Sequence, residues 1–305
     1  MPKKRIEKVA EKLKKDGYIF DCDGLLSALK SKFTEVITKD SKLFFLGVII
    51  DESSPRKDTF LNEINFLDHF GENYYLPKLI EYSKEDLYLV REDVGGTTAG
   101  NVYFFNSQIM LNNQFIGRIV NRFQTIWSLP TYKSLPSFNY NIIYNNLERI
   151  ASSKTKGKEF ASKILSNFQS KQSILDKEKS YLIHGDLQPT NILINDLKIN
   201  LIDFEAVSEG PIYYDIASAY HRLDKFAARQ SEYKECVLNY FKRSKKHFDQ
   251  SLFDLFYSYY LLIDIDSLED VYINKIKKPF HHTEISETEA TELQNLYMKK
   301  ISALI

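Results

Sequence analysis

Residues 181–205 read YLIHGDLQPTNILINDLKINLIDFE, and this stretch indicates more about the protein than any other part of the sequence. Two short apolar runs, ILI and INLI, flank a turn and pair naturally as an antiparallel hairpin. Because a hairpin returns the chain to where it began, Asn191 before the first run and Asp203 after the second are expected at the same open end. Asp186 lies on the Pro-containing loop before Asn191 and can fold back over that end. The spacing therefore predicts that Asp186, Asn191 and Asp203 converge on one point.

The three side chains have the chemistry of a metal-dependent site. Carboxylate and amide oxygens suit Mg²⁺, which prefers a few carboxylates plus substrate phosphates to a full protein cage. A carboxylate that does not bind the metal is free to accept a proton from a hydroxyl group. Single Asp and Asn residues are ordinary in turns, so the interpretation depends on the combination of all three with the two apolar runs.

The stretch resembles the catalytic loop and metal loop of kinase folds, HxDxxxxN followed by a DF dipeptide. Here the residues are HGD at 184–186 and DFE at 203–205, and GPIYYDIA follows at 210–217. In this form the sequence looks like the aminoglycoside phosphotransferase/choline kinase family of small-molecule kinases. The resemblance implies an α+β, two-lobed protein-kinase-like fold, with a small antiparallel β-rich N-terminal lobe and a larger helical C-terminal lobe.

The resemblance also implies a role for each residue of the motif. Asp186 is expected to be the catalytic base that orients and deprotonates the acceptor hydroxyl. Asn191 and Asp203 are expected to hold the Mg²⁺ ions that bridge the phosphates of ATP or GTP. His184 and Asp215 are expected to support the catalytic loop, Asp215 by accepting hydrogen bonds from its backbone. The implied reaction moves the γ-phosphate to a hydroxyl of a small molecule such as an aminoglycoside, a sugar or an amino alcohol.

The rest of the chain fits this organisation. In the first hundred residues, the pattern predicts a charged helix at 5–15 and an inserted helix at 59–70, with strands at 33–38, 43–50, 79–82 and 87–90. From about residue 106 the pattern changes to long amphipathic segments, at 114–127, 140–151, 158–175 and 226–248. We therefore expect a nucleotide-binding lobe over residues 1–96 and a helical lobe, with the catalytic and metal loops, over residues 97–305.

The expected nucleotide-binding lobe departs from the family pattern at one position. The segment after the last strand is similar to the family's hinge, whose backbone at Arg91 and Asp93 would bind adenine. Glu63 lies on the inserted helix, where the family places a glutamate that pairs with a strand lysine. The best-matching strand position is occupied by Gly47.

Two lysines near that strand are candidates to replace the missing one. Lys42 at the start of the strand or Lys57 in the loop after it could swing in to neutralise the phosphates, because lysine acts there as a mobile point charge. The missing lysine leaves an alternative open, a pseudokinase that binds nucleotide or serves as a scaffold without phosphoryl transfer. A protein kinase is less favoured, because HGD replaces HRD and no APE-type segment follows Asp203.

The composition argues against several other functions. The 305 residues include 41 Lys+Arg and 41 Asp+Glu, and the formal net charge of zero disfavours a nucleic-acid partner. No stretch reaches the roughly 18 uninterrupted apolar residues of a membrane span. The basic start of the chain carries no long apolar run, so a secretory signal is not expected. We expect a cytoplasmic protein whose partner is a small-molecule hydroxyl acceptor, and the sequence gives no indication of the oligomeric state.

Overall fold

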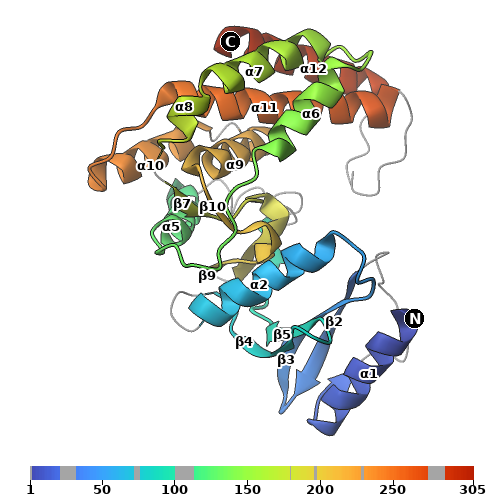
Figure 1. Ribbon diagram of the computed structural model, residues 1–305. Helices are drawn as coiled ribbons and strands as arrows, with labels where there is room; N and C mark the ends of the chain where they lie inside the picture. Colours follow the sequence, from blue (N-terminus) through green and yellow to red (C-terminus); the bar gives the residue numbers. More distant parts are fainter. Residues whose placement is uncertain are drawn as a thin grey trace. The chain divides into compact units, whose positions relative to one another are not determined.

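The chain folds into two compact units, described here by a computed structural model (Figure 1). The structure describes residues 2–20, 32–71, 76–99, 113–178, 180–195, 198–227, 230–273 and 286–305. The first unit consists of Met1–Pro136 and His184–Glu209, and the second of Ser137–Ile183 and Gly210–Ile305. These units are defined by contacts within the fold. The lobes predicted at 1–96 and 97–305 are defined by their expected functions, nucleotide binding and catalysis, so the lobe boundary stays a prediction.

The first unit is built on a five-stranded antiparallel sheet with strand order β1-β2-β3-β5-β4. Its strands are β1 (Ile19–Phe20), β2 (Lys32–Lys39), β3 (Lys42–Ile49), β4 (Leu79–Ser83) and β5 (Tyr88–Glu92). Asp40 and Ser41 join β2 to β3 with positive φ angles of 49° and 61°. Positive φ at both central residues is typical of the tight turn that matches the twist of a hairpin. The strands predicted in this part of the sequence are confirmed.

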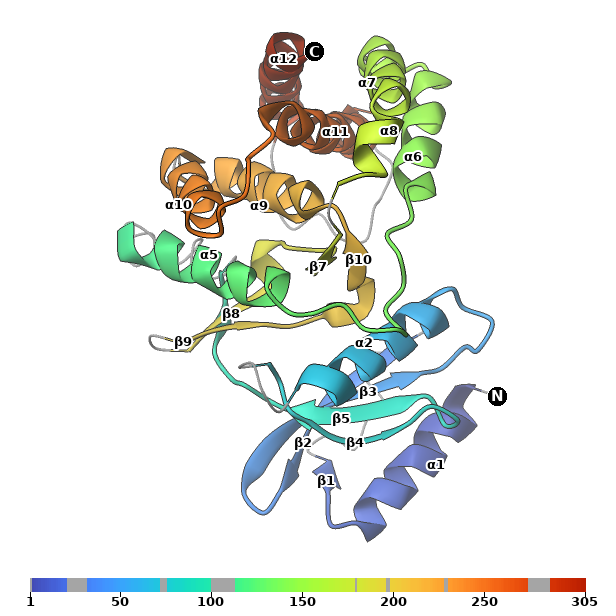
Figure 2. The same ribbon diagram turned by 60° about the vertical axis from the view of Figure 1, so that its left-hand side comes forward.

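Helices α1 (Pro2–Lys15) and α2 (Arg56–Phe70) cover opposite faces of this sheet (Figure 2). Successive strand residues point to opposite faces, so neighbours in the chain enter different cores. Val48 is buried in the core that includes α1 residues, whereas Ile49 is buried with Phe60 and Ile64 of α2. The face covered by α2 carries the charged side chains described below.

The predicted hairpin of the motif is confirmed in a second, three-stranded sheet of the same unit. Its order is β6-β8-β9, with β6 at Thr97–Thr98, β8 at Ile192–Asn195 and β9 at Lys198–Leu201. One short 3-10 turn, η1 (Pro189–Asn191), precedes the hairpin in the chain, and another, η2 (Phe204–Ala206), follows it. Helix α5 (Asn113–Trp127) packs against β9. The motif therefore belongs to the unit that contains the N-terminal sheet.

The second unit is mainly helical. It contains α6 (Asn141–Ala151), α7 (Lys158–Ser170), α8 (Gln172–Leu175), α9 (Ile212–Ala227), α10 (Gln230–Arg243), α11 (Gln250–Leu268), the π-helical turn η3 (Glu269–Ile273), α12 (Glu287–Leu304) and the strand β7 (Tyr181–Ile183). The strand β10 (Ser208–Gly210) spans the junction of the two units. Helix α11 packs against α7, α9 and α12. No helix within the described part of the chain is both long and apolar enough to cross a membrane.

Two predicted helices differ in extent from the structure. The helix expected at 226–248 is mainly α10, which covers Gln230–Arg243, and the helix expected at 158–175 is divided into α7 and α8. The sequence pattern did not predict most of α9, which starts at Ile212. Its first turns are almost entirely buried, as at Tyr213 and Ala217.

Candidate active site

All of the sequence-predicted site residues except Asp215 lie in the first unit. Asp215 is fully buried in the first turn of α9, in the second unit. Its support of the catalytic loop stays a prediction. The motif residues lie on or next to the loop around Asp186, and Glu63 and Arg91 lie at the face of the sheet that α2 covers. Lys42, Lys57 and Asp93 lie outside these two groups.

The carboxylate of Asp186 is held by two side-chain amides from its own loop. The Nδ2 of Asn191 donates to Oδ2 of Asp186 at 2.9 Å and to the Asp186 carbonyl oxygen at 3.0 Å. The Nε2 of Gln188 donates to the same Oδ2 at 2.8 Å. Two donors on one oxygen fix the direction of the carboxylate. A carboxylate that accepts a proton from a hydroxyl group must be oriented in this way. Asn191 uses its amide nitrogen in these bonds, and its amide oxygen is the atom that it could offer to a cation.

Gly185 explains why this motif reads HGD. Its φ is +80°, a conformation that residues with a Cβ atom rarely adopt. A Cβ atom at this position would lie 2.3 Å from the carbonyl oxygen of Ala206. The loop therefore runs too close to the segment after Asp203 for any side chain at position 185.

His184 ties the loop to the strand that leads into Asp203. Its imidazole is fully buried, with Nε2 3.0 Å from the carbonyl oxygen of Ile202. A carbonyl only accepts, so Nε2 carries the hydrogen, and Nδ1 can accept the backbone N–H of Asp186 at 3.4 Å. The N–H of Ile202 donates in turn to the Asn191 carbonyl oxygen at 3.0 Å. These bonds join the loop to the strand end, and the supporting role of His184 stays a prediction.

Three carboxylates gather where the motif meets α2. Oxygen atoms of Glu63, Asp203 and Glu205 all lie within 4.8 Å of one another. Phe204, between the last two, is fully buried, and its ring centroid lies 4.6 Å from that of Phe66 on α2. This aromatic contact places Asp203 and Glu205 beside Glu63. An all-oxygen set of this kind fits a hard cation such as Mg²⁺ or Ca²⁺.

The sequence did not single out Glu205 as part of this site. It paired Asn191 with Asp203 as metal ligands, and the structure adds two carboxylates around Asp203. Glu205 occupies the last position of the DFE tripeptide, where the related kinase motif has glycine. That departure was the available sequence signal.

Two cations face the carboxylate of Glu63, and neither is Lys42 or Lys57. The Nζ of Lys32 lies 4.0 Å from Oε2 of Glu63, and the Nε of Arg91 lies 3.8 Å from Oε1. Lys32 also forms an ion pair with Glu205. Lys42 is exposed at the start of β3, Lys57 is half-buried in the first turn of α2, and neither forms an ion pair with any residue that the structure describes.

Strand register explains this arrangement. Lys32 lies opposite Ile49, and Arg91 lies opposite Phe45. Directly paired residues of antiparallel strands share a face. Ile49 is buried in the core that α2 helps to form, so Lys32 projects to the same side as Glu63. The sequence pattern predicts a strand that begins at residue 33, one residue after Lys32, so it does not place Lys32 in the sheet.

Burial and charge act in opposite directions on these groups. Burial lowers the pKa of Lys32, but the nearby charges of Glu63, Glu205 and Asp203 outweigh it and raise the pKa above its usual value. Burial raises the pKa of Glu63, against the lowering effect of Lys32 and Arg91. Lys32 therefore keeps its positive charge at neutral pH.

The predicted adenine contacts at Arg91 and Asp93 stay a prediction. Arg91 is part of β5, and its buried guanidinium lies over the ring of Phe45 at 4.2 Å. Its side chain therefore belongs to the group of charges around Glu63. The backbone N–H of Asp93 donates to the carbonyl oxygen of Leu43 at 3.3 Å, and its side chain accepts the N–H of Gly95 at 3.0 Å. Both contacts order the segment that follows β5.

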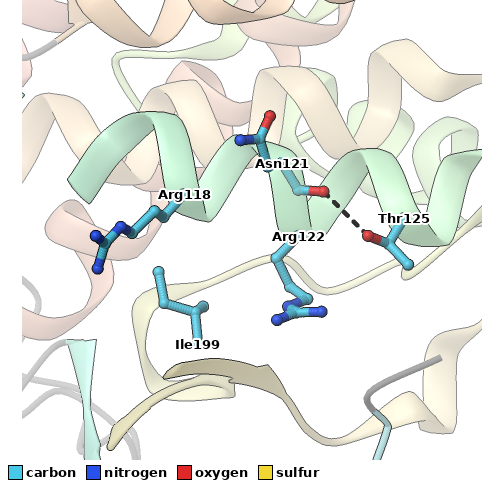
Figure 3. Close-up of a pocket in the computed structure, with 5 residues that line it drawn as sticks. All are labelled: Arg118, Asn121, Arg122, Thr125 and Ile199. Carbon is cyan, nitrogen blue, oxygen red and sulfur yellow. Dashed lines mark hydrogen bonds between the residues drawn. The ribbon is translucent and has the colours of Figure 1, made fainter. Parts of the chain in front are cut away.

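A separate cavity of about 310 Å³ lies between α5 and β9 (Figure 3). Its lining consists of five residues, Arg118, Asn121, Arg122, Thr125 and Ile199. None of them is among the predicted site residues. The hydroxyl of Thr125 donates to the Asn121 carbonyl oxygen at 3.1 Å, within the helix itself.

The motif segment has a counterpart among known enzymes. Residues 151–242 match the phosphotransferase enzyme family. The match includes the whole motif and Asp215, so the predicted resemblance is confirmed, together with the predicted class of a phosphotransferase. No curated protein matches the chain significantly in sequence.

Solved structures confirm the predicted α+β, protein-kinase-like fold class. The choline kinase LicA from Streptococcus pneumoniae is 15% identical, with a TM-score of 0.63 over 98% of this chain and 99% of that chain. The amicoumacin kinase hAmiN, in complex with AMP-PNP and Ca²⁺, is 15% identical, with a TM-score of 0.62 over 99% and 95%. An aminoglycoside-3'-phosphotransferase of type VIII is 13% identical, with a TM-score of 0.58 over 86% and 98%. At this level of identity the likeness concerns the fold.

Proposed function

We propose that this protein transfers the γ-phosphate of ATP or GTP to a hydroxyl group of a small molecule in the cytoplasm, in a Mg²⁺-dependent reaction. The observation that carries the proposal is the carboxylate of Asp186, aimed by Asn191 and Gln188 on a loop hydrogen-bonded to the strand end that leads into Asp203. The match of residues 151–242 to the phosphotransferase enzyme family supports it.

The chemical step needs one base and a well-ordered cluster of charges. Asp186 orients the acceptor hydroxyl and accepts its proton as the oxygen attacks. A bond forms between that oxygen and the γ-phosphorus, the bond from the γ-phosphorus to the β,γ-bridging oxygen breaks, and the nucleoside diphosphate leaves with the electron pair. Positioning and charge neutralisation supply most of the catalysis in such transfers.

The oxygen ligands of the cluster suit the metal ion of this reaction. Asp203 and Glu205 belong to the acidic cluster, and together with the amide oxygen of Asn191 they are the groups that would hold Mg²⁺. When bound, Mg²⁺ would neutralise charge on the phosphates. The same residues fit Ca²⁺, the ion named with AMP-PNP in the amicoumacin kinase structure.

The acceptor that we propose is an amino-bearing hydroxyl compound, such as an aminoglycoside, an amino sugar or an amino alcohol. The similar solved structures support this choice, because they include a choline kinase, an ethanolamine kinase and aminoglycoside phosphotransferases. A neutral sugar is the next acceptor class to test.

A pseudokinase is the second candidate, and Gly47 is the observation that favours it. Lys32 argues against the pseudokinase. It lies beside Glu63 although the strand position where the family has its lysine is occupied by Gly47.

The test is to incubate the full chain with Mg²⁺, ATP or GTP and a panel of choline, ethanolamine, aminoglycosides and neutral sugars, with products followed by mass spectrometry. We expect one class to gain a phosphate, with none formed when Asp186→Asn replaces the wild type. Nucleotide binding without any phosphorylated product across the panel and without hydrolysis of the nucleotide would favour the pseudokinase.

A further inference from the structure

Lys32 reaches the glutamate of α2 from β2, the strand next to the one on which a lysine was expected. Only 12% of its side chain is exposed, against 2% for Glu63. Its Nζ lies over the ring of Phe60 at 5.6 Å, within ion-pair distance of both Glu63 and Glu205. A buried lysine must be compensated by opposite charge, and this one has two carboxylate partners.

The room beside Gly47 is already filled. A Cβ atom at Gly47 would lie 3.3 Å from Cε2 of Phe60 and 3.6 Å from Cε1 of Phe45. Lys32 lies over the first of these rings, and Arg91 lies over the second at 4.2 Å. Aromatic faces attract cations. The two rings therefore occupy the space next to Gly47 and support cations that come from the neighbouring strands.

The charges around Arg91 and Lys32 indicate which of the two cations can bind a ligand. Arg91 faces Glu63 and is only 6% exposed, so it compensates that carboxylate within the core. Lys32 bridges the same glutamate and Glu205, and Glu205 is also a member of the acidic cluster that fits a cation. A metal ion bound by Asp203 and Glu205 would withdraw Glu205 from Lys32, which would then face the anionic phosphates that accompany the metal.

We propose that Lys32 is the residue that binds the nucleotide phosphates in place of a lysine at position 47, and that Glu205 holds Lys32 when no nucleotide is bound. The inference deepens the proposed function and rests on it. It assigns the role to a residue that neither the motif nor the strand pattern identified.

The direct test compares nucleotides by calorimetry on the wild type and on Lys32→Met, with Mg²⁺ present. We expect Mg-ATP and Mg-ADP to bind at least ~10-fold more weakly to the variant, where tenfold corresponds to about 1.4 kcal/mol. Adenosine, which has no phosphate, should bind both proteins equally. Lys8→Met is the matched control. Lys8 lies on helix α1, on the other face of the sheet, and forms an ion pair with Asp86.

A second variant keeps the proposal testable if Lys32→Met folds poorly. Glu205→Gln leaves Lys32 in place and removes its acidic partner. With the metal chelated, we expect ADP to bind this variant about 3-fold more tightly than the wild type, because the phosphates no longer compete with Glu205 for Lys32. With Mg²⁺ present, the loss of a carboxylate from the cluster should weaken binding.

Several outcomes would overturn the inference. One is unchanged Mg-ATP affinity in Lys32→Met, above all if Lys42→Met or Lys57→Met loses it. Another is an equal loss of adenosine and ATP affinity in a Lys32→Met variant whose thermal unfolding matches the wild type, because the lysine would then not act through the phosphates. Metal-free ADP affinity that does not rise in Glu205→Gln removes the role assigned to Glu205. The proposed function fails separately: phosphate-dependent binding through Lys32 with no transfer to any acceptor would leave the inference standing and refute the phosphotransferase.

Discussion

The motif loop and the face of the sheet around Gly47 assemble their charged groups in different ways. The loop takes Asp186, Asn191 and Asp203 from one short stretch of chain, and backbone turns and nearby amides position them. The sheet face takes its groups from β2, α2 and β5, at residues 32, 63 and 91, and strand register together with the packing of α2 on the sheet brings them together. A local pattern in the sequence can predict the first kind of site, whereas the second depends on contacts between distant residues.

The largest effect should come from the local part. Asp186→Asn keeps the shape of the side chain but removes the base, so transfer to the acceptor should fall by about 100-fold or more. Mg-ATP affinity should stay close to that of the wild type, because the base is not a main nucleotide contact. Transfer rates and calorimetric affinities measure the two effects, with Asp58→Asn, exposed on α2, as the control. Wild-type turnover in Asp186→Asn would mean that the base is another residue.

Asp203 lies where the two parts meet. Asp203→Ala removes one of three clustered carboxylates. The Mg²⁺ concentration needed to support ATP binding should therefore rise by about 10-fold, because the hard cation loses a carboxylate ligand. Titrating Mg²⁺ at a fixed ATP concentration measures this. An unchanged Mg²⁺ dependence would remove Asp203 from the metal site.

Much of the local part could be predicted from the sequence, because its residues are close in the chain. The hairpin and the fold class followed from one stretch, whereas the roles of Asp186, Asn191 and Asp203 in one site stay predictions. Lys32 could not be identified in that way. Its role depends on its pairing with Ile49 and on the ring of Phe60, which fills the space beside Gly47. Neither is visible to a pattern that reads one strand at a time, and Lys42 and Lys57 were chosen for their nearness in sequence.

Gly185 provides a test of how closely the loop is packed. Gly185→Ala places a Cβ atom 2.3 Å from the Ala206 carbonyl oxygen at a φ of +80°. Backbone strain of this kind costs about 1–3 kcal/mol, and activity should fall with stability. Gly117→Ala is the matched control, since nothing lies within 4 Å of its Cβ position on α5, and it should stabilise the helix by about 0.5–1 kcal/mol. Thermal unfolding of both variants checks this, and equal behaviour of the two would contradict the close approach.

The smallest effect is expected at Gly47. In Gly47→Ala the new Cβ atom would lie 3.3 Å from the Phe60 ring, which must give way slightly. Such a change should alter stability by no more than about 1 kcal/mol and leave Mg-ATP affinity unchanged. Denaturant unfolding and calorimetry measure the two quantities. Loss of nucleotide binding in this variant would show that position 47 itself lines the site and would weaken the distinction drawn between the two regions.

Calorimetric titration of ATP and GTP into the wild-type protein, with and without Mg²⁺, tests the central claim most directly. The account requires a working nucleotide site despite glycine at position 47, with Lys32 supplying the cation and Asp203 the metal ligand. It predicts binding of at least one of the two nucleotides that strengthens when Mg²⁺ is present. Binding of neither nucleotide, with or without Mg²⁺, would contradict it.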